Sequence, residues 1–226
     1  MRNNIGNCFL LNFSELKLMC ASMGYEKVFA FELGNTELDE KQSLLILNEL
    51  VNIGVYSNTG DGFRMNRPYD EIIRLICSEN TMICIYYNDS FVSDICCYLS
   101  DEYIVMTELE AESRKLRFTI CDRSEFMGLL LLRTNLSNRM TGTENIPPKE
   151  LLDEEILSLD SDGVPDSSMS MIVHIKKRAV NRNNSENVYI FKKALGNYIS
   201  YRSNNLSEDY VYSEELLESI LLSMLR

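Results

Sequence analysis

Residues 81–133 decide the fold: TMICIYYNDSFVSDICCYLSDEYIVMTELEAESRKLRFTICDRSEFMGLLLLR. Four short segments in this stretch are rich in Ile, Val, Tyr and Phe, at residues 82–88, 91–99, 103–110 and 115–121. Only two to four residues separate consecutive segments, which is too few for a parallel crossover, so neighbouring strands must run antiparallel. A leucine-rich helix over residues 124–133 follows and covers one face of the strands. The stretch predicts an α+β fold, with antiparallel β-meanders flanked by helices.

Composition is typical of an ordinary globular protein. The chain has 226 residues, of which 45% are hydrophobic and 25% charged, and this is enough to bury a core. No apolar run approaches the roughly 20 residues that span a bilayer, and the first residues lack the apolar core of a signal peptide. We therefore expect no membrane partner. The formal net charge of −12 argues against nucleic acid, whose binding needs clustered Lys and Arg.

Cysteine usage indicates a reducing compartment. The seven cysteines are an odd number without a CxxC pair, and most lie in segments expected to be helices or strands. A free thiol there acts as a small hydrophobe, so we expect a cytoplasmic protein and no disulfide scaffold. Adjacent Cys96 and Cys97 would point to opposite faces of a strand, which does not suit a shared zinc ion. The sequence predicts no metal and no cofactor.

The first 80 residues predict a helix, a second helix, a hairpin and a third helix. Ser14 is expected to cap the first helix, and Asp39 or Thr36 to start the second, which ends at Gly54. Glycines in the sequence NTGDG then permit the positive φ angles of a hairpin. Pro68 fits the first turn of the third helix. Helix, hairpin and helix in this order, over residues 14–78, predict a winged-helix-like N-terminal unit.

Polar residues after the meander divide the chain into two lobes. Residues 134–148 carry Gly142 and the Pro147-Pro148 pair, and we interpret them as the main linker. The N-terminal lobe is expected at residues 1–140, with the winged-helix-like unit followed by the meander and its helix. The C-terminal lobe is expected at residues 141–226.

The C-terminal lobe is expected to begin with an acidic connector that includes a short helix. Strands are predicted near residues 171–177, 188–193 and 197–202, and Ser213 is expected to cap a final helix. Both lobes thus end in antiparallel strands followed by a helix, so we expect two similar lobes.

No catalytic constellation stands out. His174, the single histidine, lies in a run that alternates as a strand does. It is either a general base for a cysteine or an exposed strand histidine beside lysines, and the lack of a nucleophile signature favours the second. Glu108, Glu110 and Glu112 would share one face of a strand, where a solvated sheet face is favoured over a glycosidase-like carboxylate pair. We assign no catalytic residue.

The winged-helix-like unit is poorly suited to DNA. Residues 36–66 carry five acidic and two basic side chains, whereas a DNA-reading helix and wing need positive charge. Winged modules with acidic faces can bind proteins instead, so protein binding is favoured over transcriptional regulation.

Charge is segregated in the C-terminal half. Residues 144–166 hold eight acidic residues and one basic, whereas residues 172–202 hold seven basic residues and one acidic. These charges either form solvated faces or pair with each other when the acidic connector folds back over the basic strands. Alternatively, the basic residues and the tyrosines between them form a patch that docks an acidic protein segment. Nucleic acid at this patch is a further, less favoured option. The candidate partner-binding residues are Lys176, Lys177, Arg178, Lys192, Lys193, Tyr198, Tyr201 and Arg202.

One stretch carries a family resemblance. The run LLILNELVNIGV over residues 44–55, followed by a hairpin, resembles the early helix and wing of EspG-type proteins. The block of meander then helix, repeated loosely in the C-terminal half, is also similar to that family. EspG-type proteins are cytosolic chaperones of type VII secretion that hold an aggregation-prone helical substrate until export. The resemblance implies such a role, and it transfers no substrate-contacting residue.

The sequence as a whole favours a non-enzymatic cytosolic protein that binds another protein, as a secretion chaperone or adaptor. The partner would present an acidic segment or an exposed helix, and a homo-oligomer is also compatible. A winged-helix transcriptional regulator is the first alternative, and an enzyme with an unrecognised site is the second.

Overall fold

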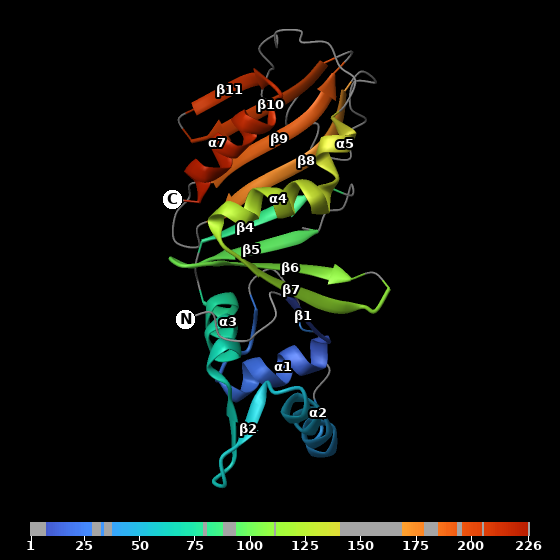
Figure 1. Ribbon diagram of the computed structural model, residues 1–226, viewed down its shortest axis with the longest axis vertical. Helices are drawn as coiled ribbons and strands as arrows, with labels where there is room; N and C mark the ends of the chain where they lie inside the picture. The colour runs from blue at the N-terminus through green and yellow to red at the C-terminus, as the bar shows by residue number, and fades with distance from the viewer. Residues whose placement is uncertain are drawn as a thin grey trace. The chain divides into compact units, whose positions relative to one another are not determined.

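The computed structural model describes residues 8–28, 33, 38–78, 81–87, 94–110, 112–140, 169–178, 185–193, 196–204 and 206–225. Helices and antiparallel strands make up these residues, which confirms the predicted α+β class (Figure 1). The chain divides into two compact units, one of Met1–Asn80 with Cys96–Ile120 and one of Thr81–Ile95 with Cys121–Arg226. None of the described helices is long and apolar enough to cross a membrane.

The first unit contains most of the predicted meander. Its strands lie in the order β1 (Cys8–Leu11), β7 (Lys115–Cys121), β6 (Ile104–Glu110) and β5 (Ile95–Leu99). Strand β1, which we did not expect, pairs antiparallel with β7, with Phe9 opposite Phe118. The rings of Phe9 and Phe118 stack with their centroids 4.9 Å apart. The ring of Tyr69 contacts Phe9 edge-on, with the centroids 5.3 Å apart. Aromatic packing therefore joins β1 both to the meander and to the helix that carries Tyr69.

Three helices and a hairpin complete this unit. They are α1 (Phe13–Ser22), α2 (Glu40–Asn52), the hairpin β2 (Tyr56–Asn58) and β3 (Phe63–Met65), and α3 (Arg67–Cys77). The expected cap at Ser14 is wrong. Asn12 caps α1 instead, because its side chain accepts from the Glu15 N–H at 2.8 Å while the Glu15 carboxylate accepts from the Asn12 N–H.

The other residues predicted to begin or end helices in this region are confirmed. Asp39 caps α2, Gly54 follows its C-terminus with φ 78°, and Pro68 lies in the first turn of α3. The winged-helix-like character of this unit stays a prediction. The sequence VFAF over residues 28–31 also predicts a short strand, and only Val28 of these residues is described.

The second unit is built on longer strands. Their order is β4 (Met82–Tyr86), β8 (Met169–Arg178), β9 (Ser185–Lys193), β10 (Gly196–Ser203) and β11 (Leu206–Val211), and every neighbouring pair is antiparallel. The register shifts between Met171 and Val173, which marks a bulge in β8. The sequence predicted β8 to β10 but not β11. The middle of β11 is the polar run Ser207, Glu208 and Asp209, so the strand lacks the apolar alternation that would reveal it.

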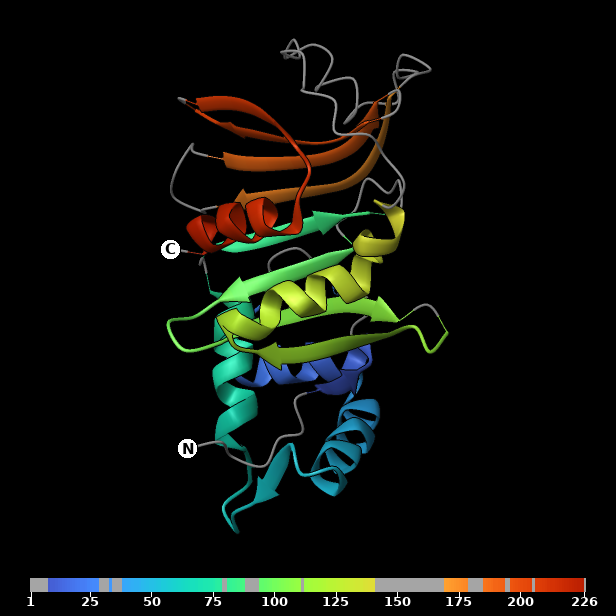
Figure 2. The same ribbon diagram turned by 45° about the horizontal axis from the view of Figure 1, so that its top comes forward.

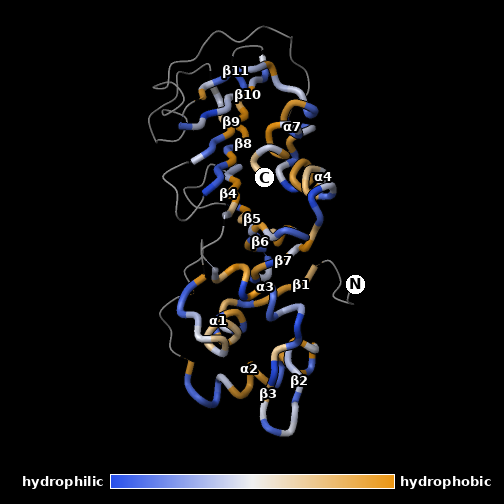
Figure 3. The backbone as a smooth tube through the Cα atoms, turned by 90° about the vertical axis from the view of Figure 1, so that its left-hand side faces the viewer, coloured by the Kyte–Doolittle hydropathy of each residue, from blue (hydrophilic) through white to orange (hydrophobic). Residues whose placement is uncertain are grey.

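Helices cover one face of these strands. They are α4 (Arg123–Thr134), α5 (Leu136–Arg139) and α7 (Glu214–Met224), and Figure 3 shows α4 and α7 on the same side of the strands. Register places Ile175, Ile190 and Ile199 on one face, and all three are fully buried. Ser213 caps α7 as expected. Figure 2 shows α7 lying along the strands of its unit.

The expected division into lobes stays a prediction. Residues 141–168, which hold most of the linker and the whole acidic connector, lie outside the described residues. The beginning of the expected linker is helical, because α5 occupies Leu136–Arg139.

Helix α4 offers a test of the capping chemistry in the second unit. The Asp122 carboxylate accepts from the backbone N–H groups of Ser124 and Glu125, both at 2.9 Å. We expect Asp122→Ala to lower the free energy of unfolding by about 1 kcal/mol, because two N–H groups lose their acceptor. Asp122→Asn keeps the acceptor and is expected to retain most of that stability. Urea unfolding followed by circular dichroism measures both, and an unchanged Asp122→Ala variant would contradict the assignment.

Candidate protein-binding surfaces

His174 lies inside an aromatic stack on β8. Its side chain is only 6% exposed, so the expectation of an exposed strand histidine is wrong. The imidazole lies between the rings of Tyr86 and Tyr189. Its centroid is 5.2 Å from the centroid of the Tyr86 ring and 4.4 Å from that of the Tyr189 ring. Its Nε2 atom is 3.1 Å from the Oδ1 atom of Asn187. These contacts with two rings and an amide hold the imidazole as part of the packing between β4, β8 and β9.

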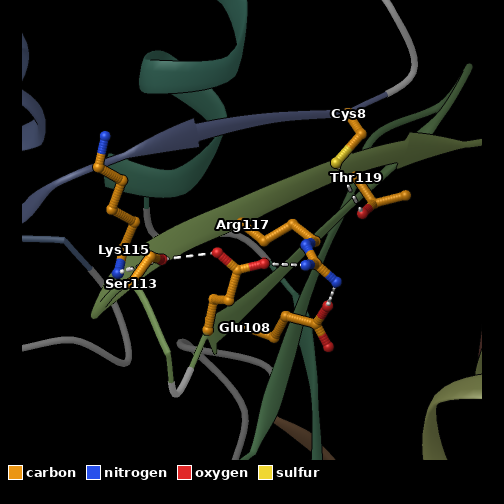
Figure 4. A network of polar contacts seen from close by, with 7 residues as sticks. Cys8, Glu108, Ser113, Lys115, Arg117 and Thr119 are labelled. Carbon is orange, nitrogen blue, oxygen red and sulfur yellow. Dashed lines mark hydrogen bonds and ion pairs between the residues drawn. The ribbon is translucent and has the colours of Figure 1, made fainter.

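The acidic residues of β6 are paired with a cation. Figure 4 shows the Arg117 guanidinium beside the carboxylate of Glu108, which is 3.2 Å away. The same guanidinium also forms an ion pair with the carboxylate of Glu110. A hydrogen bond from Ser113, together with Arg117, lowers the pKa of the Glu110 carboxyl. Glu112 lies beyond the end of β6, in the turn that precedes β7. The arrangement is a charge-paired sheet face, and it separates Glu112 from the two other carboxylates.

Metal ligation finds no support in the described part of the chain. No group of three or more His, Cys, Asp or Glu side chains there is arranged to hold a metal ion. All seven cysteines are free thiols, and each of them except Cys8 is buried.

The eight candidate residues from the sequence, which we name the basic surface, lie on β8, β9 and β10. Neighbouring residues of a strand point to opposite faces, so these residues do not form a single patch. Register places Lys176, Arg178, Lys193, Tyr198 and Arg202 on one face and Lys177, Lys192 and Tyr201 on the other. Their role in binding a partner stays a prediction.

Several members of the basic surface have partners within the same strands. The Lys177 ammonium lies 3.2 Å from the carboxylate of Glu186, which also accepts a hydrogen bond from Tyr201. The Arg202 guanidinium lies 2.9 Å from the carboxylate of Asp209, and both side chains are largely buried. The charges of Lys177 and Arg202 are therefore neutralised within the sheet, by Glu186 of β9 and Asp209 of β11.

The first unit carries a different candidate, which the sequence reasoning missed. Four large apolar residues on α2, its C-cap and the adjoining hairpin are exposed, and we name them the α2 surface: Leu44 is 52% exposed, Leu45 57%, Ile53 59% and Phe63 45%. By contrast, the one buried residue of α2 is Leu50. The helix therefore presents two adjacent leucines to solvent, while Ile46, Leu47 and Val51 are partly buried and Leu50 is fully buried.

The position of α2 is fixed by backbone contacts at its C-terminal end. The Val55 N–H donates to the Leu50 carbonyl at 2.8 Å, and the Asn66 side chain donates to the Gly54 carbonyl at 2.6 Å. The hairpin thus holds the helix end while Leu44 and Leu45 remain exposed.

The sequence contained a signal for this surface. Residues 44–47 are four consecutive apolar side chains, and successive residues of a helix differ by about 100° in direction. They cannot all face the core, so part of the run must be exposed.

Comparison with known proteins adds information about the fold. The antiparallel strands and covering helices define an α+β class that also contains a secretion chaperone. The matching structure is the Mycobacterium tuberculosis type VII secretion system chaperone EspG5 in complex with a PE25–PPE41 dimer, with a TM-score of 0.58. The match covers 96% of this chain and 95% of that chain at 9% sequence identity. The likeness in element order is thereby confirmed, and at this identity it establishes the fold alone. No family model and no curated protein sequence matches the chain.

The ion pair of Arg202 and Asp209 tests whether the basic surface is structural. We expect Arg202→Met to lower the free energy of unfolding by about 3 kcal/mol, because it leaves the buried Asp209 carboxylate without its cation. The double variant Arg202→Met/Asp209→Leu is expected to recover most of that loss. Lys192→Met is the matched control, with an expected change within about 0.5 kcal/mol. Chemical denaturation measures all three, and equal effects of Arg202→Met and Lys192→Met would exclude a structural role.

Proposed function

We propose that this protein is a non-enzymatic, chaperone-like protein that binds another protein through the α2 surface. The bound protein, which we name the client, presents an apolar helical segment, and the proposal includes a role in secretion from the cytosol. The observation that carries the proposal is the likeness of fold to EspG5 over almost the whole of both chains. EspG5 is described as a type VII secretion system chaperone in complex with a PE25–PPE41 dimer, which supports a protein partner here.

The exposed side chains of α2 support a binding role. Scattered exposed leucines are normal on a protein surface, whereas adjacent ones on a helix with a single buried residue need a reason. Leu44 and Leu45 are adjacent and both more than half exposed. A partner that covers them would remove apolar area from water, and such burial is the main favourable term in protein association.

Charge near the α2 surface suggests the chemistry of the client. Among the described residues of the helix, its cap and the hairpin, the acidic side chains are Asp39, Glu40, Glu49 and Asp61, and the basic ones are Lys41 and Arg64. A client segment with basic residues flanking its apolar side chains would complement this balance, because charge at the rim favours encounter and fixes orientation. We therefore expect an amphipathic helix with flanking Lys or Arg.

The proposal is tested by affinity capture of the tagged chain from cells of its source organism, with partners identified by mass spectrometry. We expect one client at a stoichiometric level, and we expect that client to precipitate when it is produced without this chain. Co-expression followed by gel filtration then measures the complex. The absence of any stoichiometric partner at low salt would contradict the proposal.

Matched leucine variants locate the binding surface. We expect Leu44→Asp/Leu45→Asp to reduce client recovery at least about ten-fold, because two desolvated contacts become charged. Leu132→Asp, at a residue of α4 that is 72% exposed, is the control and is expected to leave recovery unchanged. A second copy of this chain is the alternative occupant of the α2 surface, and sedimentation of the pure chain tests for it. If the pure chain is a dimer and the Leu44→Asp/Leu45→Asp variant is a monomer, the α2 surface binds a second copy and the client proposal is wrong.

A further inference from the structure

Two cysteine side chains meet inside the first unit. Cys20 in α1 and Cys77 at the end of α3 have Sγ atoms 3.5 Å apart. Both are buried, with Cys20 0% and Cys77 7% exposed. A disulfide needs a sulfur–sulfur distance of about 2.05 Å, so a movement of roughly 1.5 Å would bring the atoms to bonding distance. Side-chain rotation within two contacting helices can supply a movement of this size.

The two thiols differ in acidity. The contact with Cys20 lowers the pKa of Cys77, whereas the contact with Cys77, together with burial, raises the pKa of Cys20. The thiolate is the reactive form of cysteine in disulfide exchange. Cys77 is also the more accessible thiol, at 7% exposed against 0% for Cys20, so we assign the first attack to Cys77 and the resolution of the mixed disulfide to Cys20.

We propose that Cys20 and Cys77 form a reversible disulfide by exchange with a low-molecular-weight disulfide of the glutathione class. This proposal does not rest on client binding, and it goes beyond the proposed function. Transient, redox-responsive disulfides are the kind found in reducing compartments, so a pair of this type is compatible with a cytosolic protein.

The exchange proceeds in two balanced steps. The Cys77 thiolate attacks one sulfur of the small disulfide, which forms a mixed disulfide and releases one thiolate that takes up a proton. The Cys20 thiol then loses its proton and attacks the Cys77 sulfur, which forms the Cys20–Cys77 bond and releases the second small thiol. The cysteine pair is oxidised by two electrons, and the small disulfide is reduced to two thiols.

The disulfide would change the mobility of the α2 surface. Residues 20 and 77 are 57 positions apart, and the segment between them contains α2 and both hairpin strands. A cross-link between α1 and α3 closes this segment into a loop and removes conformations from the unfolded chain. Oxidation is therefore expected to restrict local opening of the helix–hairpin–helix region.

The test is peptide mapping of the full chain after equilibration with oxidised and reduced glutathione. Cys8→Ser is used as the background, because Cys8 is the exposed thiol and would otherwise form mixed disulfides. Cleavage by trypsin and a glutamate-specific protease separates Cys77, in residues 75–79, from the other cysteines. We expect one linked pair of peptides that contain Cys20 and Cys77, a loss of two alkylatable thiols, and reversal by dithiothreitol.

Other outcomes overturn the proposal. Complete alkylation of all thiols in the denatured protein after equilibration would exclude the disulfide, and so would linkage between different cysteines. Cys77→Ala is expected to abolish the loss of two thiols, whereas Cys121→Ala, at another buried thiol, is expected to retain it. If either variant fails to fold, the peptide map of the Cys8→Ser protein decides alone.

Thermal unfolding tests the cross-linking effect. We expect the oxidised protein to unfold about 5 °C or more above the reduced protein, because the loop is long. An equal or lower unfolding temperature would show that the bond strains the helices and does not stabilise them, and would overturn this part of the proposal.

Discussion

Burial of an apolar strand face beneath helices is the constraint on which both units depend. In the second unit, three neighbouring strands contribute Ile175, Ile190 and Ile199 to one face, and all three residues are fully buried. Figure 3 shows that α4 and α7 lie on the same side of these strands. In the first unit, Phe9 stacks on Phe118 of β7 and meets α3 through Tyr69. Antiparallel strands alternate their side chains, so each strand run needs such a cover on its apolar face.

The same constraint explains where charge and apolar area remain. Charged side chains on the strands form ion pairs with neighbouring strands. Arg117 of β7, for example, pairs with Glu108 and Glu110 of β6. Helix α2 buries Leu50 fully but leaves the adjacent Leu44 and Leu45 more than half exposed. The proposed binding role follows from these exposed leucines, whereas Lys177 and Arg202 of the basic surface are engaged by carboxylates of their own sheet.

Local chemistry made much of the fold predictable. Short turns between apolar runs predicted the meander strands, and Asp39, Gly54, Pro68 and Ser213 marked helix ends because their side chains or φ angles suit those positions. Tertiary contacts decided what was missed. Strand β1 is defined by its pairing with β7, more than 100 residues away in the sequence, and β11 by its pairing with β10. The burial of His174 likewise depends on rings from β4 and β9, and no local pattern could reveal it.

Hydrogen exchange of the chain with and without its client tests the central claim most directly, because it reports which backbone amides the client protects. The account predicts slower exchange in peptides from residues 40–65, which cover α2 and the hairpin, and little change in peptides from residues 185–211. Protection confined to residues 169–211 would place the client on the strands that carry the basic surface and would contradict the assignment to α2.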